Sequence, residues 1–162
     1  MMKKKVRMWQ GLILGSFISL ISLVSFISLC GCVQLNAPVK LRVNSAPELN
    51  HDSDQASLPV VLKVYQLKDE QPFKQANFEE LWKKDKATLS GSLLSTQSYT
   101  IYPGKTERFQ ISRTKGARFL GVVATFRKPE TDTWKAVSTI PGGMAAKSIY
   151  IHLQENQIRI TN

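Results

Sequence analysis

Apolar side chains recur at every second position in seven short segments of this 162-residue chain, and an eighth segment, residues 59–67, is more continuously apolar, as expected of a central strand. Such alternation is typical of β-strands that turn one face to a core and the other to solvent. The segments are separated by frequent turns, so they predict a mostly β protein, a two-sheet β-sandwich of about eight strands. They cover residues 39–44, 59–67, 98–102, 107–112, 119–127, 134–140, 149–153 and 158–160.

One segment departs from the period of two and predicts a helix over about residues 78–90. Asn77 is followed three positions later by Glu80, the spacing of a capping box. Apolar positions at Phe78, Leu81, Trp82 and Leu89 then follow helical spacing. A single amphipathic helix is thus expected between the second and third strands. We expect its apolar stripe to pack on the sandwich, and a groove of a partner is the alternative.

The first 31 residues have the organisation of an export signal. Three lysines and one arginine among the first seven residues precede an apolar stretch from Met8 to Leu29, and small residues follow. This order predicts a secretory signal peptide over residues 1–31. The stretch also approaches the roughly 20 residues of a membrane span, so an uncleaved amino-terminal anchor is the alternative.

The signal ends in Leu29-Cys30-Gly31-Cys32, which resembles the bacterial lipobox. In lipoproteins with this motif, the thiol of the last residue receives diacylglycerol and the chain is cut before that residue. The resemblance implies cleavage between Gly31 and Cys32, with covalent lipid on Cys32. A redox pair is the less favoured alternative, because the chain has only two cysteines.

Lipidation would divide the chain into the signal peptide 1–31, the lipidated Cys32 with a tether to residue 38, and the sandwich domain 39–162. The six tether residues 33–38 reach about 20 Å when extended, so the domain should lie near the membrane. Val33 follows the cysteine where Asp would direct retention in the inner membrane of enterobacteria. This favours the outer membrane.

The net charge of +10 belongs partly to the signal. Without residues 1–31, 18 basic and 12 acidic residues remain, a balance of +6. This mildly basic body is not typical of a nucleic-acid-binding protein.

Enzyme and metal sites find little support in the sequence. His51 and His152, the only histidines, lie far apart and lack companion ligands, and each is expected on the surface. The adjacent Glu79 and Glu80 are better explained by the helix dipole than by acid–base catalysis. Pro141-Gly142-Gly143 lies between strands and lacks the following helix of a phosphate loop. We therefore expect no enzymatic activity, no metal, no small-molecule substrate and no cofactor besides the lipid.

The loop between the first two strands is the loop that indicates most about function. Its twelve residues exceed the roughly 2–5 of an ordinary hairpin, which indicates either a partner-binding loop or a flexible excursion. It carries three carboxylates, whereas the rest of the mature chain carries +9, so it could orient docking electrostatically. The loop consists of Pro47, Glu48, Leu49, Asn50, His51, Asp52, Ser53, Asp54, Gln55, Ala56, Ser57 and Leu58.

Five stretches in order along the mature chain carry a family resemblance. They are VVLKVYQLKD at 60–69, FEELW at 78–82, PG at 103–104, LGVVATFR at 120–127 and WKAV at 134–137. Together, behind the lipobox, they resemble the type VI secretion lipoprotein family (TssJ, also called SciN or VasD). The resemblance rests on the occurrence of all five stretches in this order.

The resemblance implies a transthyretin-like sandwich of two four-stranded sheets without enzymatic activity. It further implies a lipoprotein on the periplasmic face of the outer membrane of a Gram-negative bacterium. Its partner would be the periplasmic carboxy-terminal domain of the large inner-membrane protein TssM, which in turn joins TssL. In the family the loop between the first two strands contributes to that contact, and here it maps to residues 47–58. The alternatives are a lipoprotein of another envelope assembly and a periplasmic ligand-binding or inhibitor lipoprotein.

Overall fold

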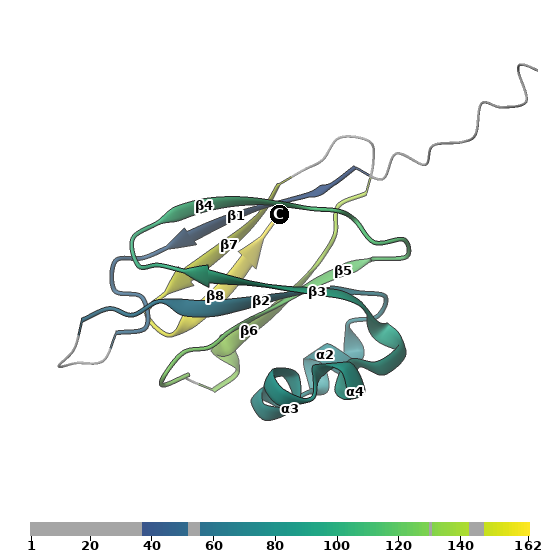
Figure 1. Ribbon diagram of the computed structural model, residues 1–162, viewed down its shortest axis with the longest axis horizontal. Coiled ribbons are helices and arrows are strands. Elements are labelled where there is room, and N and C mark those ends of the chain that lie inside the picture. Colours follow the sequence, from purple (N-terminus) through teal and green to yellow (C-terminus); the bar gives the residue numbers. More distant parts are fainter. Residues whose placement is uncertain (1–36, 52–55, 130, 143–147) are drawn as a thin grey trace, which may run out of the picture. The chain divides into compact units, whose positions relative to one another are not determined.

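The computed structural model of this chain describes residues 37–51, 56–129, 131–142 and 148–162. The predicted signal peptide, Cys32, the tether up to residue 36 and loop residues 52–55 lie outside the described residues. Within these described residues, eight strands form two four-stranded sheets, which confirms the predicted sandwich (Figure 1). The strands are β1 (Val39–Ser45), β2 (Val60–Leu67), β3 (Leu93–Ile101), β4 (Thr106–Ile111), β5 (Phe119–Ala124), β6 (Lys135–Thr139), β7 (Ser148–Gln154) and β8 (Gln157–Thr161).

The first sheet has the strand order β4-β1-β7-β8, and the second has the order β3-β2-β5-β6. All neighbours are antiparallel except β1 and β7, which run parallel. Alternate residues of β1, from Val39 to Val43, are buried and face the second sheet, as the period of two predicted. They meet the buried side chains of β2, β5 and β7 in one hydrophobic core.

Strands β2 and β5 are buried on both faces. Leu62 and Val64 pair with Ala124 and Val122 on the face toward the first sheet. Tyr65, on the opposite face of the same sheet, is also fully buried. This double burial explains why residues 60–67 read as a nearly continuous apolar run rather than an alternating one.

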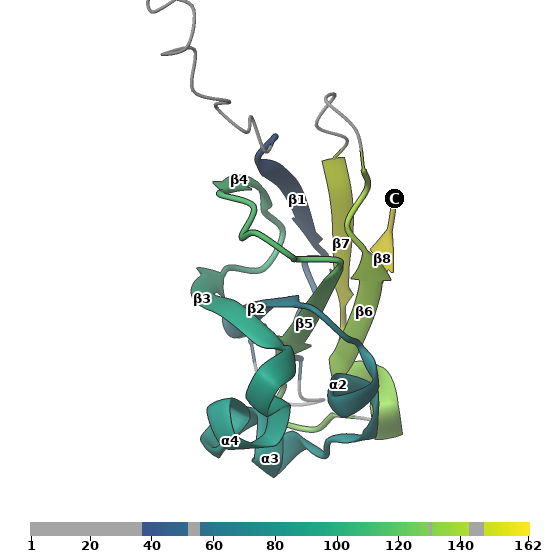
Figure 2. The ribbon, with the colours of Figure 1, turned by 90° about the vertical axis from the view of Figure 1, so that its right-hand side faces the viewer.

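Short helices cover the outer face of the second sheet (Figure 1 and Figure 2). They are α2 (Gln71–Gln75), α3 (Phe78–Lys83) and α4 (Asp85–Leu89), followed by the 3-10 turn η1 (Ser90–Ser92). The predicted capping box is present: the Asn77 side chain accepts a hydrogen bond from the Glu80 amide, and the Glu80 carboxylate accepts one from the Asn77 amide. The helix predicted over 78–90 is broken at Lys84, whose backbone leaves the helical region (φ −131°, ψ 25°).

Helix α2 was not predicted from the sequence. Pro72 stands in its first turn, where the missing amide hydrogen does no harm. Its Phe73 is buried and packs against the β5 backbone at Gly121. A Cβ at Gly121 would lie 2.8 Å from the Phe73 ring, so only glycine lets the helix approach the sheet this closely.

The structure extends one predicted strand and shortens another. Strand β3 begins at Leu93, five residues before the predicted start at Ser98. The prediction missed its first half because these residues are half-buried or exposed at the sheet edge and show no clear alternation. Strand β5 ends at Ala124 rather than at Arg127. In the described residues, every helix is too short or too polar to cross a membrane.

Candidate interaction surface

Four loops meet at one end of the sandwich. Strand β1 ends there beside the start of β4 and the ends of β7, as the pairing of Asn44 with Thr106 and of Ser45 with Leu153 requires. Direct connections β3–β4 and β7–β8 close the same end, and the β1–β2 and β5–β6 loops join them. We call this end, formed by the described residues 46–51, 56–59, 102–105, 125–129, 131–134 and 155–156, the loop end. Strand β1 begins at the opposite end (Figure 1).

Asn50 ties three of these loops together. Its backbone N–H donates a 2.7 Å hydrogen bond to the backbone carbonyl of Glu155 in the β7–β8 turn. Its side-chain Oδ1 accepts a 2.8 Å hydrogen bond from the amide of Arg127 in the β5–β6 loop, and its Nδ2 donates to the Pro59 carbonyl at 3.4 Å. The residue is only 4% exposed and adopts φ 53°, a left-handed conformation that asparagine tolerates better than most residues.

Leu49 closes the base of the β1–β2 loop. Its side chain is fully buried in the core, and its carbonyl accepts a hydrogen bond from the Leu58 amide at 3.1 Å. The loop thus contains two adjacent buried residues, Leu49 and Asn50, which the sequence analysis treated together with the exposed residues of the loop. Leu49 and Asn50 shape the loop, and they offer little surface to a partner.

The remaining residues of the predicted partner-binding loop are more accessible. Pro47, Glu48, His51 and Ala56 are exposed, whereas Ser57 and Leu58 are half-buried. Residues Asp52, Ser53, Asp54 and Gln55 lie outside the described residues. Two of the three predicted carboxylates of the loop are therefore without a described position.

The β3–β4 turn adds an aromatic side chain that the sequence interpretation missed. Tyr102 is 55% exposed, the most accessible large apolar side chain among the described residues. Its carbonyl accepts a 2.6 Å hydrogen bond from the Ser45 hydroxyl, and Gly104 of the same turn donates to the Ala46 carbonyl. Gly104 has φ 65°, which favours glycine, and it lies against Pro47. The signal in the sequence is an aromatic residue directly before a Pro-Gly turn.

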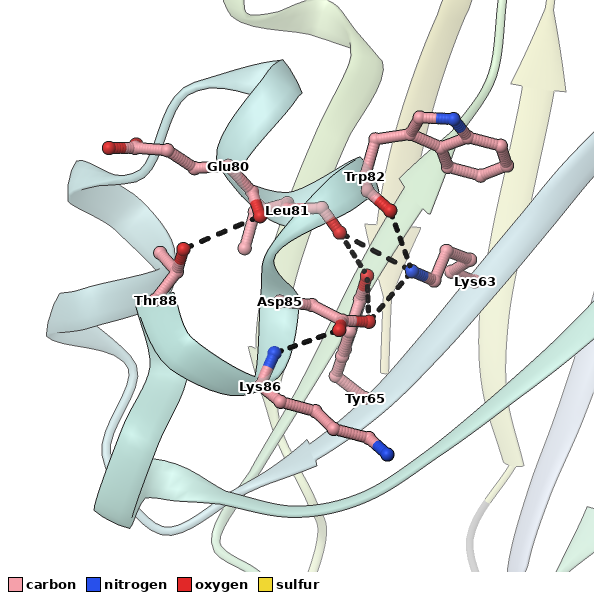
Figure 3. A network of polar contacts seen from close by, with 8 residues as sticks. All are labelled: Lys63, Tyr65, Glu80, Leu81, Trp82, Asp85, Lys86 and Thr88. Carbon is pink, nitrogen blue, oxygen red and sulfur yellow. Dashed lines mark hydrogen bonds and ion pairs between the residues drawn. The ribbon is translucent and has the colours of Figure 1, made fainter.

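The helices are fixed to the second sheet by a network around Lys63 of β2, which Figure 3 shows. The Lys63 ammonium forms a 2.7 Å ion pair with Asp85 and donates to the carbonyls of Leu81 and Trp82. The Tyr65 hydroxyl donates to the Leu81 carbonyl at 2.9 Å. A cation at the carboxyl end of α3 donates hydrogen bonds to carbonyls that lack a partner in the helix. Its charge also interacts favourably with the negative end of the helix dipole. This network is therefore explained as a structural clamp.

Lys135 of β6 forms a second clamp of the same kind. Its ammonium donates to the carbonyls of Lys74 and Ala76, at 2.7 and 2.6 Å, where α2 ends. Burial lowers the pKa of Lys135, and the carboxylates of Asp132 and Glu80 oppose this effect. Burial raises the pKa of Tyr65 far above its usual range, and the Asp85 carboxylate adds to the effect.

The apolar stripe predicted for the helix packs only partly on the core. Leu81 and Leu89 are fully buried, as expected, but Trp82 is 38% exposed. The Trp82 ring stacks on Phe78, one turn earlier in α3, and its centre lies 5.3 Å from the Lys63 ammonium. The packing of Trp82 was thus predicted wrongly.

The described residues lack the constellations that metal chemistry needs. No group of three potential metal ligands occurs among them. His51 and His152 are exposed, as predicted. What the loop end offers is an accessible tyrosine, a proline and a carboxylate on a hydrogen-bonded base, an arrangement suited to binding another protein.

Comparison with protein families gives a clear match. The sequence model described as "Type VI secretion lipoprotein, VasD, EvfM, TssJ, VC_A0113" matches residues 37–156. A search of curated proteins returns no match.

Solved structures of similar fold come from the same secretion system. TssJ1, a type VI secretion lipoprotein from Pseudomonas aeruginosa, is 28% identical with a TM-score of 0.69, over 77% of this chain and 96% of that one. Lip from Serratia marcescens, described as a membrane-bound component of the system, is 20% identical with a TM-score of 0.71, over 77% and 97%. A chain of a structure described as the TssM C-terminal domain from EAEC is 22% identical with a TM-score of 0.65, over 77% and 98%.

Proposed function

The chain belongs to the type VI secretion lipoprotein family, and from this we propose that it anchors the membrane complex of that system to the outer membrane. In this proposal, lipid on Cys32 holds the sandwich at the periplasmic face of the outer membrane. The loop end binds the periplasmic carboxy-terminal domain of TssM and, through TssM, is linked to TssL. The protein acts by binding and carries out no reaction.

The lipid anchor is supported by the lipobox at residues 29–32. Strand β1 begins at Val39, six residues beyond Val33, at the end of the sandwich opposite the loop end. A domain attached through this strand leaves its four loops at the end remote from the attachment. The loop end is thus free to meet a partner that reaches across the periplasm.

The contact with TssM is supported by the structure and the charge of the loop end. Asn50 joins three loops by hydrogen bonds, so the surface is preorganised, and a preorganised surface loses less conformational freedom on binding. Tyr102 supplies an accessible aromatic side chain of the kind enriched at protein interfaces. Carboxylates at residues 48, 52 and 54 favour a basic patch on the partner.

The observation that carries the proposal is the family match over residues 37–156 on a fold whose loops gather at one end. The experiment is a pull-down of the tagged full-length protein from bacterial membranes in mild detergent, with mass spectrometry of its amino terminus and of the proteins retained. We expect a triacylated Cys32 at the amino terminus and TssM among the retained proteins. An amino terminus at unmodified Met1 would contradict the anchor. Retention of a different envelope assembly without TssM would contradict the partner.

A further inference from the structure

The outer face of the first sheet is strongly basic. Because alternate residues of β1 are buried, the residues between them point away from the core, and the strand register extends this to β4, β7 and β8. Four outward-facing cations, all exposed, lie on this face. They are Lys40, Arg42, Arg108 and Arg159.

Acidic side chains are missing from the part of this face where β1 begins. The outward positions of the four strands carry no carboxylate. Asp132 lies at the far edge, beside β8, where it lines a hollow together with Arg159 and His152. Among the described residues, no carboxylate forms an ion pair with Lys40, Arg42 or Arg108.

Arg42 and Arg108 are directly opposed across two antiparallel strands. Like charges in this position repel and destabilise the pair unless an anion lies between them or near them. On its other side, Arg42 lies over the Tyr150 ring, 5.8 Å from the ring centre. Two arginines at paired positions and an adjacent tyrosine form a surface suited to phosphate groups, which arginine binds in a bidentate manner.

The position of this basic cluster in the chain narrows the choice of partner. Lys40 is the second residue of β1, so the cluster begins directly after the predicted tether. The tether of residues 33–38 spans about 20 Å at most. On the proposed function, therefore, these cations are held within a short distance of phospholipid headgroups at all times.

We propose that the cluster of Lys40, Arg42 and Arg108 binds anionic phospholipid headgroups of the bilayer that carries the anchor. This rests on the proposed lipidation of Cys32. The bound face would incline the sandwich toward the membrane and restrict the directions in which the loop end can point. A second copy of the chain is disfavoured as occupant, because two such faces would repel each other. Each cation near an anionic membrane surface favours contact by about fivefold, so three together favour it by on the order of a hundredfold.

The test uses the full-length protein, processed and lipidated in the cell and then reconstituted into vesicles. Gln110→Cys supplies a labelling site on the basic face, since Gln110 is exposed and is the register partner of Lys40. Energy transfer from a fluorophore at this thiol to labelled headgroups is compared between vesicles of phosphatidylcholine and vesicles that also contain phosphatidylglycerol. Lys83→Cys, on the exposed surface of the helices over the other sheet, is the control position.

We expect phosphatidylglycerol to increase transfer severalfold at position 110 but not at position 83. High salt should reverse the increase, because the cations are exposed and screened. The triple variant Lys40→Gln, Arg42→Gln, Arg108→Gln should remove it. A charge-matched triple variant on the helices, Lys83→Gln, Lys84→Gln, Lys86→Gln, should retain it when read at position 110.

Equal transfer at position 110 in neutral and anionic vesicles would overturn the inference while leaving the proposed function intact. Loss of the increase in both triple variants would show a general charge effect and would also overturn it. Protection of position 110 by added TssM instead of by anionic lipid would assign the face to a protein. Failure of the wild-type protein to insert into any vesicle would overturn the lipid anchor itself, and this result is seen before any transfer is measured.

Discussion

Single side chains that link separate elements control the shape of the loop end. Asn50 is the main example, since it bonds to segments that lie 9 and 77 residues away. Its neighbours in the sequence are polar loop residues, and nothing in the pattern distinguishes it from them. Its importance comes from burial and from the left-handed backbone, which only the three-dimensional structure shows.

We predict that Asn50→Ala lowers the free energy of unfolding by about 1–3 kcal/mol, because a buried hydrogen-bonding side chain is lost and alanine tolerates the left-handed conformation poorly. Urea unfolding measures the change. The control is His51→Ala at the exposed neighbouring position, which should stay within about 0.5 kcal/mol of the wild type. Equal stability of the two variants would show that Asn50 does not hold the loops together.

Tyr65 gives the protein a specific response to alkaline pH. The raised pKa keeps the phenol protonated in the folded state, so its contribution to stability is present below the unfolded-state pKa of about 10 and is lost above it. The free energy of unfolding should therefore fall by up to about 1.4 kcal/mol per pH unit above pH 10. Tyr65→Phe should be less stable at neutral pH, because the bond to Leu81 is lost, but should lack this component of the fall.

Urea unfolding of both proteins at about pH 9 and about pH 11 measures this response. The difference in stability between wild type and Tyr65→Phe should narrow at the higher pH. Lys135, whose lowered pKa acts in the opposite direction, is present in both proteins and cancels from the difference. A constant difference would mean that the Tyr65 phenol ionises as freely in the folded protein as in the unfolded one.

At the scale of elements, two lysines on strands hold the ends of two helices. Lys63 of β2 lies at the end of α3, and Lys135 of β6 lies at the end of α2. Short helices of five or six residues have little stability of their own. Their position on the second sheet therefore depends on these clamps and on the buried Phe73, Leu81 and Leu89.

We predict that Lys63→Met lowers the free energy of unfolding by about 2–4 kcal/mol, because it leaves the mostly buried Asp85 carboxylate and two helix carbonyls without their cation. Thermal and urea unfolding measure the loss. Lys83→Met removes the partner of Glu79 in an exposed pair and is the matched control, with an expected effect below about 0.5 kcal/mol. If the free energy of unfolding falls by less than about 0.5 kcal/mol in both variants, the ion pair of Lys63 stabilises the fold no more than an exposed surface pair does.

The sequence predicted elements better than it predicted their connections. Periodicity located seven of the strands, because a strand that is buried on one face has apolar residues at every second position. The nearly continuous apolar run located β2, which is buried on both faces. The capping box located the start of α3. The break at Lys84 and helix α2 were missed. The side chains that bond to the ends of these short helices, Lys63, Tyr65 and Lys135, lie on strands that are distant in the sequence. Tyr102 was missed as a candidate contact for a similar reason, since its exposure follows from how the β3–β4 turn packs on Ala46 and Pro47.

At the scale of the whole molecule, attachment and binding are assigned to different parts of the chain. The proposed lipid precedes β1, and the proposed contact with TssM lies at the opposite end of the sandwich. The folded domain should therefore not depend on the anchor for its structure. Both the anchor and the loop end should nevertheless be needed for the complex to work.

We predict that Cys32→Ser yields a folded protein that still binds TssM but does not support type VI secretion. Fractionation of membranes, co-purification with TssM and a secretion assay measure the three properties separately. Secretion at the wild-type level by this variant, with the protein free in the periplasm, would contradict the need for an anchor.

The most direct test of the account is a titration of the lipidated protein with the periplasmic carboxy-terminal domain of TssM. The double variant Asp52→Lys, Asp54→Lys reverses charge in the β1–β2 loop, and Glu70→Lys, Glu79→Lys makes the same change of charge on the helices. We expect the loop variant to bind at least tenfold more weakly at low salt, with unchanged stability, and the helix variant to bind like the wild type. Equal affinity of all three proteins would contradict binding through the loop end.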